Sequence, residues 1–203
     1  AVQGAKQPRL QVCAPVSPVQ MEYFSHKKPA AMLETISAMV KKCRSCCAEV
    51  EFVAEDAGRG EPEFLEKAIA AAVEAGAAVV TVCDTAGTML PDEMERSIAA
   101  IKARTGDSVR LGVMCSNELY MADACAAAAV RAGADEVKTA ACGDKTASLE
   151  SAARIFTVRG SSLDVFCAVK TTELQRTIGQ IKWMCQTSRS KTSPFDTGVR
   201  EAG

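Results

Sequence analysis

Acidic, hydroxyl and amide side chains recur in this chain directly after short runs rich in β-branched residues. The side chains placed where a run ends are Ser17, Glu55, Asp56, Asp84, Thr85, Ser116, Asn117 and Glu118. A carboxylate held at the end of a buried strand can act as a general base, and hydroxyls and amides beside it can bind a substrate. The same residue types also serve as helix caps and turn residues, so the pattern indicates where a site would form.

The elements that would position these side chains repeat along the chain. Six β-branched runs, each followed by an alanine-rich helical stretch, lie at 9–16, 50–55, 78–83, 109–115, 136–141 and 163–169. After the first run, a new one begins about every 26 to 31 residues, which is the length of one strand–helix unit. This repetition predicts a parallel sheet with helices outside it, and chemistry then collects at the carboxyl ends of the strands.

Composition predicts one globular domain and excludes several other classes. The chain has 203 residues, 48% of them hydrophobic, and a net charge of −1, so neither disorder nor a nucleic-acid partner is expected. The apolar stretches are too short to span a bilayer, and residues 1–10 lack the apolar core of a signal peptide. We therefore expect no membrane partner and a cytoplasmic location.

The ten cysteines indicate reduced thiols rather than disulfides,. Five of them fall in or beside predicted strands and are expected to be small buried hydrophobes: Cys13, Cys83, Cys115, Cys142 and Cys167,. Cys43, Cys46 and Cys47 form a cluster at the end of a helix. A zinc ribbon would need a second Cys-x-x-Cys pair, which the sequence lacks,. Adventitious thiols are the simpler interpretation, and a metal or redox site is the alternative.

Helix signals divide the chain into a barrel-like domain and a tail. Pro62 and Pro91 begin two predicted helices, which end at Gly76 and Gly106,. Residues 1–186 form the predicted domain, and 187–203 form a polar C-terminal tail. An open doubly wound sheet is the alternative fold, but no Gly-x-Gly-x-x-Gly or Walker pattern follows any strand,, which favours a barrel.

Three segments carry a family resemblance. SPVQMEY at 17–23, VEFVAEDAGR at 50–59 and DTAGTMLP at 84–91 resemble isopropylmalate synthase and homocitrate synthase. These enzymes belong to a TIM-barrel group that includes hydroxymethylglutaryl-CoA lyase. The resemblance runs from about residue 10 to about residue 185. It implies an α/β fold of the (β/α) TIM-barrel type in which this chain supplies strands three to eight of a (β/α)8 barrel.

The resemblance also implies a reaction and roles for individual residues. The reaction is a Claisen condensation of an acyl-CoA co-substrate with a 2-oxo acid at the C-terminal face of the barrel. Glu55 matches the glutamate that assists deprotonation of the acyl-CoA methyl group, and Thr85 matches a threonine that binds the substrate carboxylate. The remaining expected substrate-binding residues are Ser17, Asp84, Asn117 and Glu118. Structural alternatives are that Glu55 anchors backbone or Arg59, that Thr85 is a turn residue, and that Asn117 caps a helix.

The chain departs from the family at the metal site. The Arg-Asp-Gly segment of the first strand is not present, and Met114 and Ser116 stand where the family has two metal-binding histidines. Residues 140–144 replace the metal-proximal Asn-Gly segment, and His26, the one histidine, precedes the first long helix. Thioether and hydroxyl groups are poor substitutes for imidazole on such a metal, so we expect the family metal site to be lost and no cofactor to be required.

Some alternatives stay open from the sequence alone. Carboxylates at the strand ends could collect Mg²⁺ instead. The chain could be an acyltransferase once its barrel is complete, a non-catalytic or regulatory barrel that binds a small carboxylate or acyl-CoA, or an inactive barrel fragment stabilised by assembly. A 2-oxo acid or other small carboxylate is the expected ligand. Unpaired strand edges predict pairing with another copy or with a missing N-terminal segment, and the resemblance favours a homo-oligomer.

Overall fold

The computed structural model describes residues 4–142 and 145–189, with side chains as far as residue 185. Its five strands are β1 (Arg9–Pro15), β2 (Glu49–Glu55), β3 (Val79–Asp84), β4 (Arg110–Cys115) and β5 (Glu136–Lys138). Its helices are α1 (Pro18–Tyr23), α2 (Pro29–Cys46), α3 (Pro62–Glu74), α4 (Pro91–Thr105), α5 (Ala122–Arg131), α6 (Leu149–Leu163) and α7 (Thr171–Arg189), with a 3-10 turn, η1, at Ala57–Arg59.

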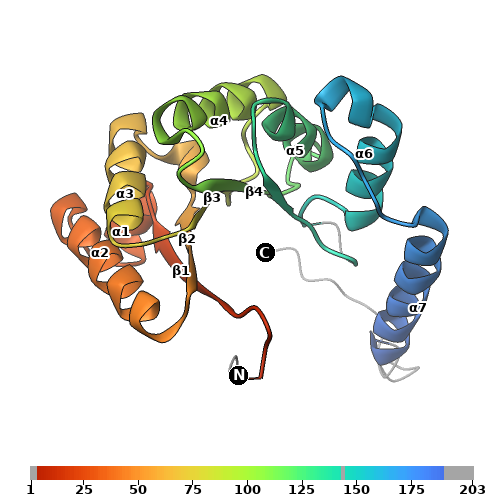
Figure 1. Cartoon of the computed structure of the whole chain (residues 1–203), viewed down its shortest axis with the longest axis horizontal. Coiled ribbons are helices and arrows are strands. Elements are labelled where there is room, and N and C mark those ends of the chain that lie inside the picture. The colour runs from red at the N-terminus through yellow and green to blue at the C-terminus, as the bar shows by residue number, and fades with distance from the viewer. Residues whose placement is uncertain (1–3, 143–144, 190–203) are drawn as a thin grey trace, which may run out of the picture.

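The strands form one curved parallel sheet in the order β1-β2-β3-β4-β5. Figure 1 shows the helices arranged in an arc on the convex side of this sheet, as in part of a barrel wall. Each crossover from one strand to the next passes through at least one helix, which parallel pairing requires,. The predicted α/β architecture of the (β/α) barrel type is therefore confirmed.

The hydrophobic core lies between the convex face of the sheet and the helices. Phe52, Val80 and Leu111 point outward from their strands and are fully buried against residues such as Ile36 and Ile98 of the helices. Because side chains alternate along a strand, the residues between them point to the concave face. One sheet therefore carries an apolar outer layer and a different, polar inner layer.

Helix boundaries follow local sequence signals. Pro62 and Pro91 stand in the first turn of α3 and α4, as predicted,. Gly76 and Gly106, just beyond these helices, have positive φ angles of 107° and 54°, which glycine adopts without a Cβ clash. In the described residues, every helix is too short or too polar to cross a bilayer.

The predicted sixth strand, 163–169, is wrong. Helix α6 continues through Gly160 to Leu163, and Asp164 ends it in the left-handed conformation with φ 53°. The chain then reverses, and the N–H of Val165 donates to the carbonyl of Gly160 at 3.0 Å. Residues 165–170 run on without regular structure. Hydrogen bonds at the helix end therefore outweigh the β-branched composition of this run.

Two further expectations about segments need correction. The first three residues of the predicted tail, 187–189, continue α7, and the rest of that tail lies outside the described residues. The helix after β4 begins at Ala122, five residues beyond Asn117, the residue considered as its cap. Of the strand cysteines, Cys83 and Cys115 are buried as predicted, whereas Cys13 is exposed because it lies on the open concave face.

Candidate functional site

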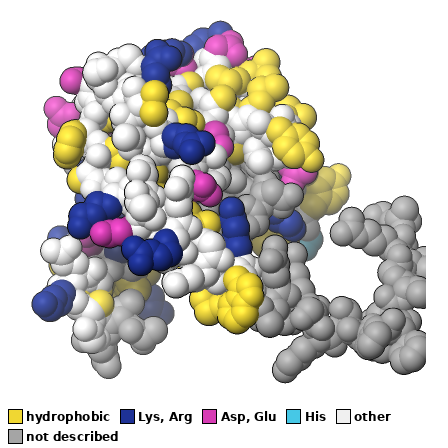
Figure 2. Space-filling view, turned by 90° about the vertical axis from the view of Figure 1, so that its right-hand side faces the viewer, with side chains coloured by type: hydrophobic (Ala, Val, Ile, Leu, Met, Phe, Trp, Pro, Cys, Tyr) yellow, Lys and Arg dark blue, Asp and Glu magenta, His cyan; other side chains and the backbone are white. Residues whose placement is uncertain are grey.

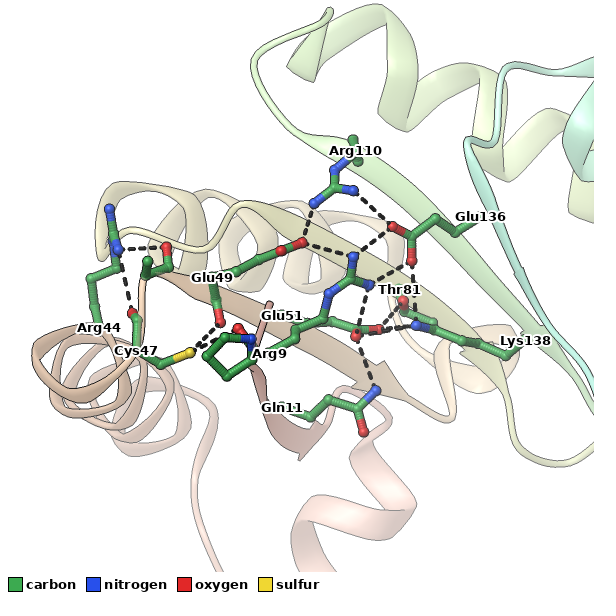
Figure 3. A network of polar contacts seen from close by, with 12 residues as sticks. Arg9, Gln11, Arg44, Cys47, Glu49, Glu51, Thr81, Arg110, Glu136 and Lys138 are labelled. Carbon is green, nitrogen blue, oxygen red and sulfur yellow. Dashed lines mark hydrogen bonds and ion pairs between the residues drawn. The ribbon is translucent and has the colours of Figure 1, made fainter. Parts of the chain in front are cut away.

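Glu55, the last residue of β2, lies at the carboxyl end of the sheet. It shares its face of β2 with Glu49 and Glu51, whose side chains point into the concave face in Figure 3,. Glu55 is half-buried. Burial is the main reason that the pKa values of the Cys13 and Cys83 thiols are raised, and the negative charge of Glu55 adds to both shifts. Glu55 therefore stands beside two protonated thiols on the concave side.

Asp56, directly after Glu55, joins three successive loops. It is fully buried and adopts a left-handed conformation with φ 59°, which is uncommon for a residue with a side chain. Its carboxylate accepts hydrogen bonds from the hydroxyl of Ser17 and from Arg59, whose Nε lies 2.8 Å from Oδ1. Its own N–H donates to Thr85 Oγ1 at 2.9 Å. The loops after β1, β2 and β3 are thereby held in one arrangement.

The ion pair with Asp56 holds the Arg59 side chain and raises its pKa. Arg59 Nη2 lies 2.8 Å from Asp56 Oδ2, and hydrogen bonding to Asp56 is the main reason that the pKa of Arg59 is raised. The alternative in which Glu55 anchors Arg59 is wrong. Arg59 pairs with Asp56 instead, so Arg59 does not bind the Glu55 carboxylate.

Asp84 organises the loop after β3. Its Oδ1 accepts the Gly87 N–H at 3.0 Å, and its Oδ2 accepts the Met89 N–H at 2.9 Å. Gly87 has φ 64°, and a Cβ there would lie 2.9 Å from the Ser116 carbonyl oxygen. Both oxygens of Asp84 thus fold the loop tightly against β4. The assignment of Asp84 to substrate binding stays a prediction that this arrangement does not favour.

Of the residues after β4, some make hydrogen bonds within the fold and others are exposed to solvent. Ser116 forms a bridge with Thr146, and its N–H donates to the carbonyl of Asp84 at 3.2 Å. Asn117 Oδ1 accepts the N–H of Ala122, the first residue of α5, at 3.1 Å, although the N-cap residue of this helix is Met121. Glu118 is exposed. Thr85 and Glu118 are therefore the predicted binding residues whose side chains face solvent.

The donor set does not fit the divalent metal that the resemblance implies. Among the described residues, no group of three or more His, Cys, Asp or Glu side chains is arranged to hold a metal ion. The positions expected to carry imidazoles hold the half-buried Met114 and the bridged Ser116. The nearby Asp84 already accepts two backbone amides. Hard cations such as Mg²⁺ prefer carboxylate and carbonyl oxygens, and transition metals such as Zn²⁺ also take imidazole, so we assign no chemical step to a metal here.

A charged network lines the concave face near the amino ends of the strands (Figure 3). Glu51 is fully buried and accepts hydrogen bonds from Thr81 at 2.6 Å, Gln11 at 3.0 Å and Lys138 at 3.1 Å. Burial raises the pKa of Glu51, but these hydrogen bonds outweigh it and lower the pKa below its usual value. The network is thus a structural layer of the inner face.

A second carboxylate of the network is held by Arg9. Two nitrogens of Arg9 contact the two oxygens of Glu136 at 2.6 and 2.9 Å. The hydrogen bonds from Arg9 are the main reason that the pKa of Glu136 is lowered. Neither this network nor the role of Asp56 as the joining residue was predicted from the sequence. The available signal was charged residues at alternate positions in or directly before predicted strands, as at Glu49 and Glu51 or Glu136 and Lys138.

The curved parallel sheet and outer helices define part of a TIM-type (β/α) barrel, and solved structures agree. Hydroxymethylglutaryl-CoA lyase from Pseudomonas aeruginosa matches with a TM-score of 0.72 at 16% identity, covering 89% of this chain and 63% of that chain. The carboxyl transferase domain of Rhizobium etli pyruvate carboxylase, determined with pyruvate and biocytin, matches with a TM-score of 0.58 at 19% identity. It covers 72% of this chain and 25% of that chain. These similarities show the fold.

Sequence relatives then place the chain in a family. The family model described as HMGL-like matches residues 1–178, and the chain belongs to this family. The 2-isopropylmalate synthase of Clostridium kluyveri is 33% identical over 183 residues, which is 87% of this chain and 36% of that protein. The chloroplastic methylthioalkylmalate synthase 1-1 of Eutrema japonicum is 37% identical over 141 residues, which is 68% of this chain and 28% of that protein. The chain thus spans about a third of the length of these relatives.

Proposed function

We propose that this chain carries the base and part of the substrate site for condensation of an acyl-CoA with a 2-oxo acid. The observation that carries the proposal is the placement of Glu55 at the carboxyl end of β2 on the concave face. Active sites of (β/α) barrels form at this end of the strands. The similarity to 2-isopropylmalate synthases supports the same reaction class.

The proposed chemistry begins with proton transfer. The Glu55 carboxylate accepts a proton from the carbon next to the thioester carbonyl of the acyl-CoA. The resulting carbanion forms a carbon–carbon bond to the keto carbon of the 2-oxo acid, whose oxygen takes up a proton. Water then cleaves the thioester and releases CoA. The peptide group between Glu55 and Asp56 is held at both of its polar atoms, because the Glu55 carbonyl accepts the Val16 N–H at 2.9 Å and the Asp56 N–H donates to Thr85.

Thr85 is the proposed contact for the carboxylate of the 2-oxo acid. It is exposed, and its Oγ1 accepts a hydrogen bond from the backbone of Asp56. A hydroxyl that accepts through a lone pair keeps its own hydrogen to donate. The Asp56 contact therefore orients the Thr85 hydroxyl as a donor at the carboxyl end of the sheet. The Cys83 sulfur lies 3.4 Å from Thr85 Oγ1.

We further propose that the reaction does not use the family metal at Met114 and Ser116. Their thioether and hydroxyl groups support this proposal. The test is to incubate the purified chain with acetyl-CoA and a set of 2-oxo acids, with chelator or with added Mg²⁺, Mn²⁺ or Zn²⁺. Free CoA and the condensed acid are quantified by mass spectrometry, since ten protein thiols would interfere with a thiol reagent.

The expected result is condensation that the chelator leaves unchanged and that Glu55→Gln lowers by about 100-fold or more. Glu74→Gln, at an exposed site on α3, is the matched control and should behave as the wild type. A reaction that appears only with added metal would contradict the metal proposal. Equal rates for the wild type and Glu55→Gln would contradict the role of Glu55.

A non-catalytic barrel that binds a small carboxylate or acyl-CoA is the second candidate. It is favoured by the commitment of Asp84 and Asn117 to backbone amides, which leaves few free polar groups at the strand ends. Calorimetric binding of acetyl-CoA or a 2-oxo acid without any product would support this candidate over the first.

A further inference from the structure

Two thiols from distant parts of the chain meet beside the last described strand. Cys142 lies in the loop after β5, and Cys185 lies on α7, 43 positions further along the sequence. Their sulfur atoms are 3.6 Å apart. Cys142 is half-buried and Cys185 is exposed, so a small reagent can reach the pair from solvent.

Helix α7 buries little of its described surface against the rest of the protein, so its cysteine can make a small movement. Ile178 is the one buried residue among the described side chains of this helix. Lys182 pairs with Glu150 of α6 at 3.5 Å, but the two side chains are 53% and 36% exposed to solvent, and exposed pairs stabilise little. A disulfide needs an S–S distance of about 2.05 Å, so a shift of less than 2 Å, roughly one side-chain rotation, brings the sulfurs together.

Other cysteines of the chain contrast with this pair. Cys83 and Cys115 are buried, and burial raises the pKa of Cys115 to about 12, so these thiols stay protonated and unreactive. Cys46 is exposed, but the contact seen for its sulfur is the Ser45 hydroxyl at 3.7 Å. Within the described residues, Cys142 and Cys185 are the thiols seen in direct sulfur–sulfur contact.

We propose that Cys142 and Cys185 are an oxidation site that forms an intramolecular disulfide with a low-molecular-weight disulfide such as oxidised glutathione as oxidant. One protein thiolate attacks the reagent and releases one reduced thiol, giving a mixed disulfide. The second protein thiolate then attacks the mixed disulfide and releases the second reduced thiol. Two protein thiols are oxidised to one disulfide, and one reagent disulfide is reduced to two thiols.

The disulfide would tie α7 to a loop that continues into the mouth of the sheet. The Ala140 N–H donates to the carbonyl of Ala147 at 3.0 Å, and the Asn117 N–H donates to the carbonyl of Lys145 at 2.9 Å. Ala140, two residues before Cys142, is thus hydrogen-bonded to a segment that also contacts the loop after β4. Figure 2 shows the side of the molecule on which α6 and α7 lie, where basic side chains are interspersed with hydrophobic ones.

The test uses the full chain equilibrated in glutathione buffers of increasing oxidised fraction, quenched by alkylation and mapped as peptides. Wild type should give a peptide that crosslinks Cys142 to Cys185, about tenfold more abundant than glutathione adducts at these residues, because the second thiol acts intramolecularly. Cys142→Ser and Cys185→Ser should instead carry glutathione on the remaining thiol. The only tryptophan, Trp183, should report crosslinking by a fluorescence change that both variants lose and that dithiothreitol reverses.

Cys46→Ser is the matched control at an exposed thiol and should form the crosslink as the wild type does. Circular dichroism of each variant checks that the fold persists. Glutathione adducts on both cysteines of the wild type without a crosslinked peptide would overturn the proposal. Crosslinking between two molecules through Cys185 would overturn it as well.

Discussion

Asp56 shows at the level of one residue how the candidate site is assembled. Its carboxylate receives Ser17 and Arg59, and its N–H reaches Thr85, so it fixes the backbone next to Glu55. This arrangement requires a left-handed backbone conformation at Asp56, which costs conformational energy in a residue that has a Cβ. The segment AEDAGR pointed to this place in the sequence. Which of its two acids joins the loops depended on contacts with residues from two other loops, which the local sequence does not encode.

Replacing Asp56 should destabilise the fold more than replacing an exposed acid. Asp56→Ala leaves the buried Ser17 hydroxyl without its acceptor, and we expect it to lower the free energy of unfolding by about 2–4 kcal/mol. Asp56→Asn should cost less, because asparagine tolerates the left-handed conformation and keeps an acceptor. Asp107→Ala removes an almost fully exposed ion-pair partner of Lys102 and should cost less than about 1 kcal/mol. Urea unfolding checks all three, and equal costs at the two sites would contradict this account of Asp56.

Glu51 should make stability depend on pH. The pKa values of Glu51 and Glu136 are lowered in the folded chain, so the unfolded chain binds more protons between the folded and unfolded pKa values. The resulting stabilisation is fully present above the unfolded pKa of about 4.3 and is lost as pH falls through the lowered folded values. Glu51→Gln should weaken this acid dependence, as measured by urea midpoints from pH 7 to pH 3. An unchanged dependence would show that Glu51 titrates alike in both states.

At the level of elements, the strands and helices with clear periodicity could be predicted from the sequence. The residues at which elements end were harder to predict. Helix starts at Pro62 and Pro91 were predicted correctly because proline acts locally,. The run 163–169 was mistaken for a strand. A Cβ at Gly160 would lie 2.5 Å from the Val165 carbonyl oxygen, so this glycine permits the close reversal that ends α6. That packing is tertiary, and β-branched composition gave no sign of it.

Strand β4 depends on a glycine at its inner face. A Cβ at Gly112 would overlap the hydroxyl of Thr81, which donates to Glu51 at 2.6 Å. Gly112→Ala should lower the free energy of unfolding by about 1–3 kcal/mol, and the cost should shrink in a Thr81→Ala background. Gly179→Ala on α7 meets no atom within 4 Å and should be neutral or stabilising by up to about 1 kcal/mol. Denaturation midpoints compare the variants, and equal destabilisation at both glycines would refute the packing argument.

At the level of the whole molecule, the described sheet leaves β1 and β5 each with one unpaired edge. Such edges invite pairing with another chain, and exposed Tyr23, Phe24 and Tyr120 add apolar surface near the strand ends. We therefore predict that the purified chain self-associates. Light scattering across a dilution series should give a mass above 21.4 kDa that falls on dilution. A monodisperse monomer with cooperative unfolding would show instead that this part of the barrel is self-sufficient.

The family could be read from the sequence because three segments keep both their letters and their order. The roles of Ser17 and Asp84 could not, because each is decided by hydrogen bonds to another loop or to backbone amides. Glu55 is the predicted site residue whose placement best suits its expected role, and the central claim rests on it.

The most direct test of that claim is exchange of the methyl protons of acetyl-CoA with deuterated water, followed by proton NMR without any 2-oxo acid. This measurement isolates the proton transfer assigned to Glu55 from the later steps of condensation. The account predicts exchange by the wild type and by Glu74→Gln, and a loss of about 100-fold or more in Glu55→Gln. Exchange in Glu55→Gln at the wild-type rate, or bound acetyl-CoA that never exchanges in the wild type, would contradict it.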